Sequence, residues 1–389
     1  MTRRGIILVL DGVGAGAARD AAVYGDVDSN TLGHVARAVG GFNLPSLASY
    51  GFGNILELQG MPPEPSPDGA WGRMEPASAG KDSTTGHWEI AGVHLAKPFP
   101  TYPRGFPADV VNEFERLTGR GVLGNVVASG TAVLDTYGRE HIETGKWILY
   151  TSADSVFQIA AHEEVVPLTE LYDACAIARK MLTPPNDVSR VIARPFEGNP
   201  GAFRRTAHRR DYSIEPPAET LLDALASAGV GRFGVGKVDD LFAGRSIRSH
   251  HTVSNADGID LIKAWLSGPE SGLLFANLVD FDQLYGHRND VAGFYNSLRE
   301  FDFALPSITS ALREEDLLFI TADHGNDPTT VSTDHAREAA PLLAIGPLVR
   351  PVDLGIRGTF SDLGATVGEW LGVSFRGRGE SFLPQLIQS

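Results

Sequence analysis

The sequence predicts an α/β fold in which a mostly parallel sheet is flanked by helices and a smaller α+β cap domain is inserted. Three observations predict this fold: unbroken apolar runs, helical patterns between them, and a middle region that is richer in proline pairs, glycine turns and short strands. Apolar runs without alternation are expected of strands whose two faces are both covered by helices. Strands that alternate with helices favour a layered α/β architecture.

Four apolar runs of the kind found in buried parallel strands are the expected strands of the main sheet: Ile6–Leu10, Leu273–Phe281, Leu317–Ala322 and Pro341–Gly346. Three helical patterns accompany them. Residues 217–229 place leucines on one stripe and stop at a glycine, and residues 361–372 begin with Ser361, a residue type that caps helices. Residues 291–313 repeat apolar residues at helical spacing, and we expect Pro306 to kink or break that helix.

The middle of the chain is rich in proline pairs, glycine turns and shorter strands such as Trp147–Ala153 and Ser189–Phe196. Pro184–Pro185 and Pro216–Pro217 are typical of hinge segments. We therefore expect a discontinuous catalytic core of residues 1–97 and 216–389, interrupted by an inserted cap domain of residues 98–215.

The composition excludes several classes of partner. The net charge of −15 leaves no basic stripe to displace counterions from a nucleic-acid backbone. No segment approaches the about 20 apolar residues of a membrane span, and the run Ile6–Leu10 is too short for a secretory signal. The single cysteine, Cys175, allows no intramolecular disulfide and is expected as a small buried residue. We expect a soluble cytoplasmic protein.

Acidic residues and histidines follow three of the expected strands. Asp11 follows the first strand, Asp280 and Asp282 the second, and Asp323 and His324 the third. In open α/β sheets, ligands bind at the carboxyl ends of the strands, so neighbouring strands would bring these side chains together. Each residue alone has an ordinary structural explanation, because an aspartate at a strand end is commonly a turn former or a helix cap.

The whole set is harder to explain without a cation. His287 and His335 lie close in sequence to these acids, and crowded buried carboxylates are costly unless a positive charge compensates them. Mixed aspartate and histidine ligands suit Mn²⁺ or Zn²⁺. Six or seven donors in two groups indicate two metal ions rather than one.

A run of hydroxyls, Ser83, Thr84 and Thr85, lies in the segment SAGKDSTTGHWE. The segment is not a nucleotide P-loop, because Glu75 stands where the first glycine is required. A metal-bound hydroxyl loses its proton more readily and becomes a nucleophile. The structural alternative is a helix N-terminus, which would itself favour a phosphoryl group.

These segments together resemble the alkaline phosphatase superfamily of metalloenzymes and, within it, the bacterial phosphopentomutase family. The resemblance covers almost the whole chain. It is carried by DGVGAG, GKDSTTGHWE, YTSADSVFQIAAHEEVVP, RVIARPF, NLVDFDQLYGHRND and TADHGNDPTTVSTDHAREAAPLLA. It implies an alkaline-phosphatase-like core.

The resemblance also implies a site with two divalent metals, usually Mn²⁺. One metal would be held, together with the nucleophilic hydroxyl, by Asp11, Asp323 and His324. The other would be held by Asp282, His287 and His335. The nucleophile of the family is usually the threonine after GKD, a position that Ser83 occupies here, and Thr84 is the second candidate.

The implied reaction interconverts ribose 1-phosphate and ribose 5-phosphate, and the 2-deoxyribose pair, through a phosphoserine and a sugar 1,5-bisphosphate that also serves as activator. By resemblance, Ser152 and Asp154 would contact the sugar hydroxyls. Because guanidinium and ammonium groups suit phosphate oxygens, the distal phosphate would be bound by Arg194, Arg205, Arg209 and Lys237.

The expected partners are small sugar phosphates, with neither nucleic acid nor membrane, and the expected state is a monomer or weak oligomer. Two other classes of protein stay open. One is a related dimetal phosphatase or phosphoglycerate mutase on the same core, and the other is a non-catalytic sugar-phosphate sensor.

Overall fold

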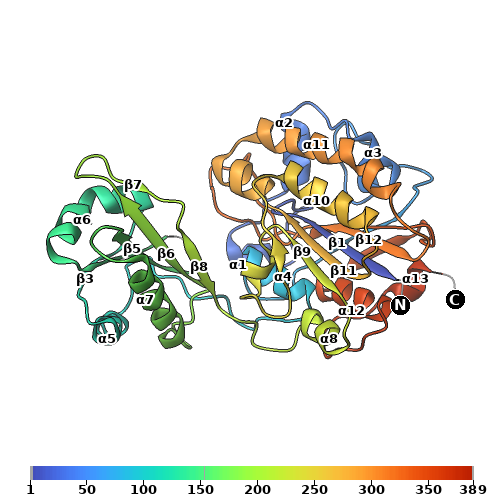
Figure 1. The fold of residues 1–389 in the computed structure, drawn as a ribbon. Helices are drawn as coiled ribbons and strands as arrows, with labels where there is room; N and C mark the ends of the chain where they lie inside the picture. Colours follow the sequence, from blue (N-terminus) through green and yellow to red (C-terminus); the bar gives the residue numbers. More distant parts are fainter. Residues whose placement is uncertain (1–2, 153, 388–389) are drawn as a thin grey trace. The chain divides into compact units, whose positions relative to one another are not determined.

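A computed structural model describes residues 3–152 and 154–387, and the chain divides into two compact units. The core unit consists of Met1–Pro98 and Pro216–Ser389, and the inserted unit is Phe99–Glu215. The boundary expected after residue 97 thus falls after Pro98, and the boundary after residue 215 coincides with the expected one. Figure 1 traces the elements of each unit along the chain.

The core unit contains an eight-stranded sheet in the order β10-β9-β11-β1-β12-β13-β2-β14. β13 alone among its described strands runs antiparallel to its neighbours. In chain order the strands are β1 (Arg4–Leu10), β2 (Ala70–Met74), β9 (Arg232–Val235), β10 (Ser249–His250), β11 (Gly272–Leu278), β12 (Asp316–Thr321), β13 (Ala340–Ile345) and β14 (Asp353–Arg357).

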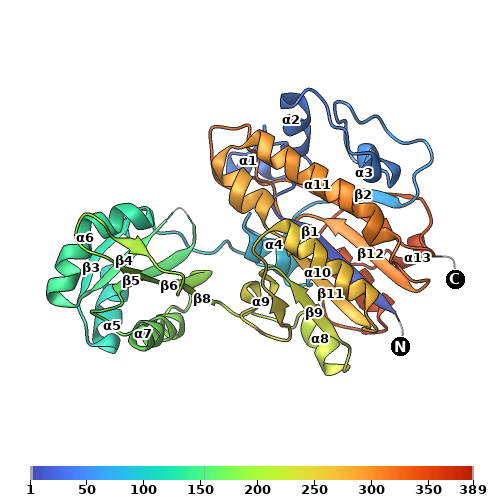
Figure 2. The same cartoon turned by 45° about the horizontal axis from the view of Figure 1, so that its top comes forward.

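Helices cover both faces of this sheet (Figure 2). One layer contains α10 (Asn255–Ser267) and α11 (Val291–Thr309), with α2 (Thr31–Ala38) and α3 (Pro45–Ser49) packed on α11. In the other layer, α12 (Ser361–Trp370) contacts α4 (Ser83–Ile90), α8 (Leu221–Ser227) and α13 (Leu383–Leu386), and α9 (Val238–Leu241) contacts α4. Every residue of β1, β11, β12 and β13 is buried, as expected for strands between two helical layers.

Short helical turns complete the core unit. They are α1 (Ala21–Tyr24), η1 (Phe52–Asn54), the π-helical turn η2 (Phe281–Tyr285) and η3 (Gly286–Arg288). No helix among the described residues is long and apolar enough to span a membrane.

The inserted unit has its own mixed sheet in the order β3-β4-β5-β6-β7, with β8 also paired to β6. Its strands are β3 (Val122–Val127), β4 (Trp147–Thr151), β5 (Val156–His162), β6 (Arg190–Glu197), β7 (Arg204–Arg205) and β8 (Arg210–Ser213), and its helices are α5 (Ala108–Thr118), α6 (Gly130–Thr144) and α7 (Leu168–Met181). Residues of α5 and α7 pack in one hydrophobic cluster, and residues of α6 pack in a second.

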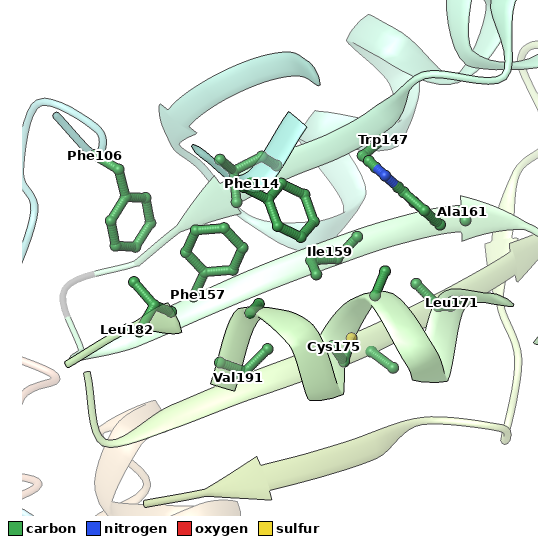
Figure 3. Packing of buried hydrophobic residues seen from close by; sticks show 14 of the residues in the cluster. Phe106, Phe114, Trp147, Phe157, Ile159, Ala161, Leu171, Cys175, Leu182 and Val191 are labelled. Carbon is green, nitrogen blue, oxygen red and sulfur yellow. The ribbon is translucent and has the colours of Figure 1, made fainter. Parts of the chain in front are cut away.

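The larger cluster gives the inserted unit a hydrophobic core of its own (Figure 3). The rings of Phe106 and Phe114 lie 4.7 Å and 5.2 Å from the ring of Phe157, measured between centroids. Cys175 is fully buried in the same cluster, as predicted, and burial raises the pKa of its thiol. Aromatic pairs at these distances add to the stabilisation that comes from burial alone.

Several expectations about individual elements were wrong. The run at Pro341–Gly346 forms β13, which is antiparallel rather than parallel to β12. Pro306 does not break α11, because the helix continues through it as far as Thr309. Ser361 is not a capping residue: Phe360 occupies the N-cap position, and the Ser361 hydroxyl donates to the Glu89 carbonyl at 2.7 Å.

Two further differences concern the inserted unit. Pro184 and Pro185 lie between α7 and β6, inside the unit, and therefore do not mark a connection to the core. The strand expected at residues 147–153 ends at Thr151, and Ala153 lies outside the described residues.

Candidate metal centre

The carboxyl ends of three adjacent strands bring the predicted ligands to one edge of the core sheet. Asp11 directly follows β1, and Asp323 and His324 come just after β12. Asp282 lies in the turn η2, shortly after β11. Because β11, β1 and β12 are parallel, with Leu10 level with Leu278 in the register, their ends and the side chains that follow them converge.

His324 lies between two carboxylates. Its Nε2 atom is 3.4 Å from Oδ1 of Asp11 and 3.5 Å from Oδ2 of Asp323. Its Nδ1 atom lies 3.1 Å from the carbonyl of Gly325. A contact of one ring nitrogen with a carbonyl is the usual way in which a protein orients the other nitrogen toward a metal.

Asp282 lies between two further histidines. Nε2 of His287 is 3.2 Å from its Oδ2 atom, and Nε2 of His335 is 3.3 Å from its Oδ1 atom. Nδ1 of His287 lies 2.6 Å from the carbonyl of Thr333, which orients the ring in the same manner. The ring centroids of His335 and His324 are 4.1 Å apart, so the two sets of side chains are neighbours.

Potential ligand atoms fall into two overlapping groups. Those of Asp282, His287 and His335 lie within 4.8 Å of one another, and so do those of Asp11, Asp282 and His324. Asp282 belongs to both groups, whereas the resemblance assigned it to one metal only. Two groups of carboxylate oxygens and imidazole nitrogens at this spacing fit two divalent ions.

Several of these buried atoms face an opposite charge at 3.2–3.5 Å without forming a hydrogen bond. Within residues 3–152 and 154–387, Oδ1 of Asp11, Oδ2 of Asp323 and Nε2 of His335 have no hydrogen-bond partner. A buried polar atom without a hydrogen bond costs about 1–3 kcal/mol, and more when it is charged. Coordination to a metal would remove this cost, so the donor set fits the ions that the sequence predicts.

The electrostatics of the cluster also favour a bound cation. Burial and the charge of Asp323 raise the pKa of Asp11. Burial opposes the charge of His324, but Asp323 and Asp11 raise the pKa of its imidazole well above the usual value. Burial would also raise the pKa of Asp282, but the surrounding imidazoles, His335 foremost, hold that pKa well below its usual value. The carboxylates therefore require positive charge close by.

The hydroxyl proposed as nucleophile lies at this cluster. Ser83 is the first residue of α4, and Asp82 is the N-cap, whose carboxylate accepts from the Thr85 backbone at 3.0 Å. The Ser83 Oγ atom is 3.1 Å from Nε2 of His324. Thr84, the second candidate, is buried in the first turn of the helix. The helix N-terminus beside Ser83 favours a negatively charged group such as a phosphoryl.

Comparison with known proteins connects this geometry to a family. The Metalloenzyme superfamily model matches residues 3–374. A phosphopentomutase of Desulfitobacterium hafniense (strain DSM 10664 / DCB-2) is 54% identical over 387 residues, which cover 99% of this chain and 100% of that protein. A phosphopentomutase of Acetivibrio thermocellus is 53% identical over 387 residues, with the same coverage. The chain belongs to the phosphopentomutase family.

The family expected from the motifs is therefore confirmed, and a solved structure supports the fold. The PH0037 protein from Pyrococcus horikoshii has a TM-score of 0.50 and 17% identity, over 97% of this chain and 98% of that one. At this identity the likeness concerns the fold alone.

Five of the residues expected to bind substrate in a phosphopentomutase lie in the inserted unit. Ser152 and Asp154 lie between β4 and β5, where the Asp154 N–H donates to the Ser152 hydroxyl at 3.3 Å. The other three are arginines on or next to β6, β7 and β8.

Two of these arginines have carboxylate or amide partners. Nε of Arg194 donates to Gln158 at 3.1 Å, and burial and the charge of Arg209 lower the pKa of Arg194. Arg209 forms a forked pair with Asp211, at 2.7 Å and 2.6 Å. Arg205 is exposed on β7. The arginines therefore make a cationic group whose charge one aspartate reduces.

Lys237 is the one predicted substrate residue in the core unit. It precedes α9, and its Nζ atom donates to Oε1 of Gln283, the residue after Asp282. This contact places the ammonium group beside the segment that carries predicted metal ligands.

Three residues that the sequence patterns did not single out contact the predicted ligands. The Asn326 amide donates to Oδ1 of Asp282 at 2.6 Å, and the Asn277 amide donates to Oδ2 of Asp11 at 2.8 Å. Asn326 comes two residues after His324, and Asn277 is the last residue but one of the buried strand β11. The signal in the sequence was therefore an amide close to a predicted ligand or to the end of a strand that leads to one.

His87 is the third. Its Nδ1 atom lies 2.9 Å from the Ser83 carbonyl and 3.2 Å from Oδ2 of Asp323, and its buried ring stacks on Phe275. It thereby joins the segment of the nucleophile to a predicted ligand. The helical spacing of four residues between Ser83 and His87 was the signal in the sequence.

Proposed function

We propose that the protein interconverts ribose 1-phosphate and ribose 5-phosphate, and the corresponding 2-deoxyribose phosphates, through a phosphoserine at Ser83. The observation that carries the role of Ser83 is its position: its hydroxyl lies 3.1 Å from Nε2 of His324, which belongs to a cluster of five potential metal ligands. Membership of the phosphopentomutase family supports the reaction.

We further propose that two Mn²⁺ ions bind at this cluster, with Asp323 added to the two overlapping groups through its position 3.5 Å from His324. Asp11, Asp323 and His324 would hold one, and Asp282, His287 and His335 the other. When bound, such ions lower the pKa of a nearby hydroxyl and stabilise the charge of a phosphoryl group in transfer.

The chain's own residues position the reacting groups. The Ser83 oxygen carries the phosphoryl, and its O–P bond breaks as a new bond forms to the sugar oxygen, so that the 1,5-bisphosphate results. After this intermediate reorients, its other phosphoryl returns to Ser83. The N–H groups at the start of α4 favour the phosphoryl there.

The remaining substrate contacts are proposals of the same kind. Ser152 and Asp154 would bind sugar hydroxyls, and Arg194, Arg205, Arg209 and Lys237 the distal phosphate. The sugar 1,5-bisphosphate would also act as activator by phosphorylating Ser83. We place such an enzyme in the cytoplasm, as a monomer or weak oligomer.

Two assays test the function. The first compares conversion of ribose 1-phosphate to ribose 5-phosphate with release of free phosphate; conversion in excess supports the mutase, and release in excess indicates a phosphatase. The second measures intact mass after incubation with ribose 1,5-bisphosphate and Mn²⁺. We expect one added phosphoryl on the parent and on Thr84→Val, and none on Ser83→Ala. An adduct that persists in Ser83→Ala refutes the role of Ser83, and no adduct on any variant favours a sensor.

A further inference from the structure

A buried guanidinium, that of Arg337, binds three carbonyls of the segment that leads into Ser83. Arg337 is 3% exposed and lies two residues after His335, just before β13. Its Nη1 atom donates to the carbonyls of Ser78, at 2.7 Å, and of Gly80. Its Nη2 atom donates to the carbonyl of Pro76 at 2.9 Å. Three carbonyls of residues 76–80 therefore face one side chain.

The other side of the guanidinium binds a carboxylate. Nε and Nη2 of Arg337 each donate to Asp20 at 2.9 Å, one to each carboxylate oxygen. All five N–H donors of the side chain thus have an acceptor, which is the full capacity of an arginine. A lysine has three donors and cannot form the planar fork, so this set of contacts requires arginine.

Asp26 is a second link between the segment that leads into Ser83 and the segment of Arg337. Its Oδ2 atom accepts from the backbone N–H of Arg337 at 2.8 Å and from Nζ of Lys81 at 3.0 Å. The ring of Tyr24 lies 4.8 Å from the guanidinium carbon of Arg337, and the Tyr24 hydroxyl accepts from the Gly80 N–H at 3.0 Å. Residues 76–81, which precede Ser83, are therefore hydrogen-bonded at several points to Arg337 and to residues that contact it, and Arg337 follows the predicted ligand His335.

The segment also needs an unusual backbone conformation. Gly80 has φ of +133°, in the region that favours glycine, and a Cβ atom there would meet Oγ1 of Thr85 at 2.8 Å. A segment with such a residue adopts its conformation only when surrounding contacts impose it. Arg337 supplies the largest share of the hydrogen bonds to it from outside.

We propose that Arg337 is a positioning residue for phosphoryl transfer: it holds residues 76–80, and through them Ser83, at a fixed place relative to the His335 segment. This inference rests on the proposed role of Ser83 as nucleophile. Arg337 contacts none of the reacting atoms, and its effect passes through the backbone of residues 76–80. Misplacement of a reacting group by about 1 Å costs on the order of 100-fold in rate.

The test compares Arg337→Lys and Asp20→Ala with the parent, all loaded with Mn²⁺. We expect kcat to fall about 100-fold in Arg337→Lys and about tenfold in Asp20→Ala, with KM for ribose 5-phosphate within about twofold of the parent value. The rate of phosphoryl incorporation from ribose 1,5-bisphosphate, followed by intact mass, should fall in parallel. The number of Mn²⁺ ions bound should stay unchanged.

Arg4→Lys is the matched control. Arg4 is also buried, pairs with both oxygens of Asp316 and donates to the Leu266 carbonyl at 2.8 Å, but it lies at the opposite end of β1 from Asp11. We expect a lower Tm in this variant and an unchanged kcat per folded molecule.

Asp20 is 45% exposed, so Asp20→Ala decides the question if Arg337→Lys does not fold. Unchanged kcat in Asp20→Ala, or a rise in KM in place of a fall in kcat, overturns the inference. An adduct that survives Ser83→Ala would instead refute the proposed function, so the two failures are distinguishable.

Discussion

Replacement of Asn326 by leucine tests whether the residues behind the ligands set the metal affinity. Asn326 is fully buried, and its amide donates to Oδ1 of Asp282 at 2.6 Å. Leucine has a similar shape and no N–H donor, so it cannot form this bond. A hydrogen bond to a charged group contributes about 1.5–3 kcal/mol. Loss of such an outer contact lowers metal affinity about 10–100-fold, or about 1.4–2.8 kcal/mol.

The two magnitudes agree, so the expected result is an apparent Kd for Mn²⁺ raised about 10–100-fold in Asn326→Leu. Isothermal titration of chelator-treated protein with Mn²⁺ measures it. Asn54→Leu is the control, because Asn54 exchanges hydrogen bonds of 2.9 Å and 2.7 Å with the backbone of Glu64, away from the ligands. Parent affinity in Asn326→Leu, or an equal loss in Asn54→Leu, would refute the reasoning.

Three more outcomes follow from the structure. Phe157→Ala should destabilise the inserted unit by about 3–5 kcal/mol, because it empties a fully buried ring site; urea unfolding followed by tryptophan fluorescence measures this, and a loss below about 1 kcal/mol would contradict the packing. Burial lowers the pKa of His141 below its ordinary 6.5, so the unfolded chain binds more protons than the folded chain and stability should fall as pH drops below about 6.5. The slope of Tm against pH should be shallower in His141→Gln than in the parent. Equal slopes in the two proteins would contradict the role of His141. Removal of metal by chelation should lower Tm, because Asp11, Asp282 and Asp323 then repel one another without compensation; a scan that is unchanged by chelator speaks against a metal at this site.

The strands that build the site were predictable from the sequence because their signal is local. Leu317–Ala322 and Ile6–Leu10 are apolar runs that end in acids, and both form strands close to the expected limits. Strand direction has no such signal, and β13 was accordingly assigned the wrong direction. The sequence of a buried strand is an apolar run whether the strand is parallel or antiparallel to its neighbours.

The residues that support the ligands were harder to predict, because their role depends on long-range contacts. Asn326 and Arg337 have no spacing that identifies their partners, since each partner lies in a distant part of the chain. The predicted metal ligands could be proposed from the sequence because aspartate and histidine carry a chemistry of their own. An asparagine or a buried arginine acquires its role only from what the fold places beside it.

The position of β1 has a consequence for synthesis on the ribosome. β1 lies between β11 and β12, which are translated long after it, and the inserted unit is made in the interval. Because domains generally fold as units during translation, the inserted unit can complete its own core while β1 still has neither neighbour. A nascent chain that ends before residue 272 therefore exposes an apolar segment to chaperones, and that segment is protected only when the last third of the polypeptide emerges.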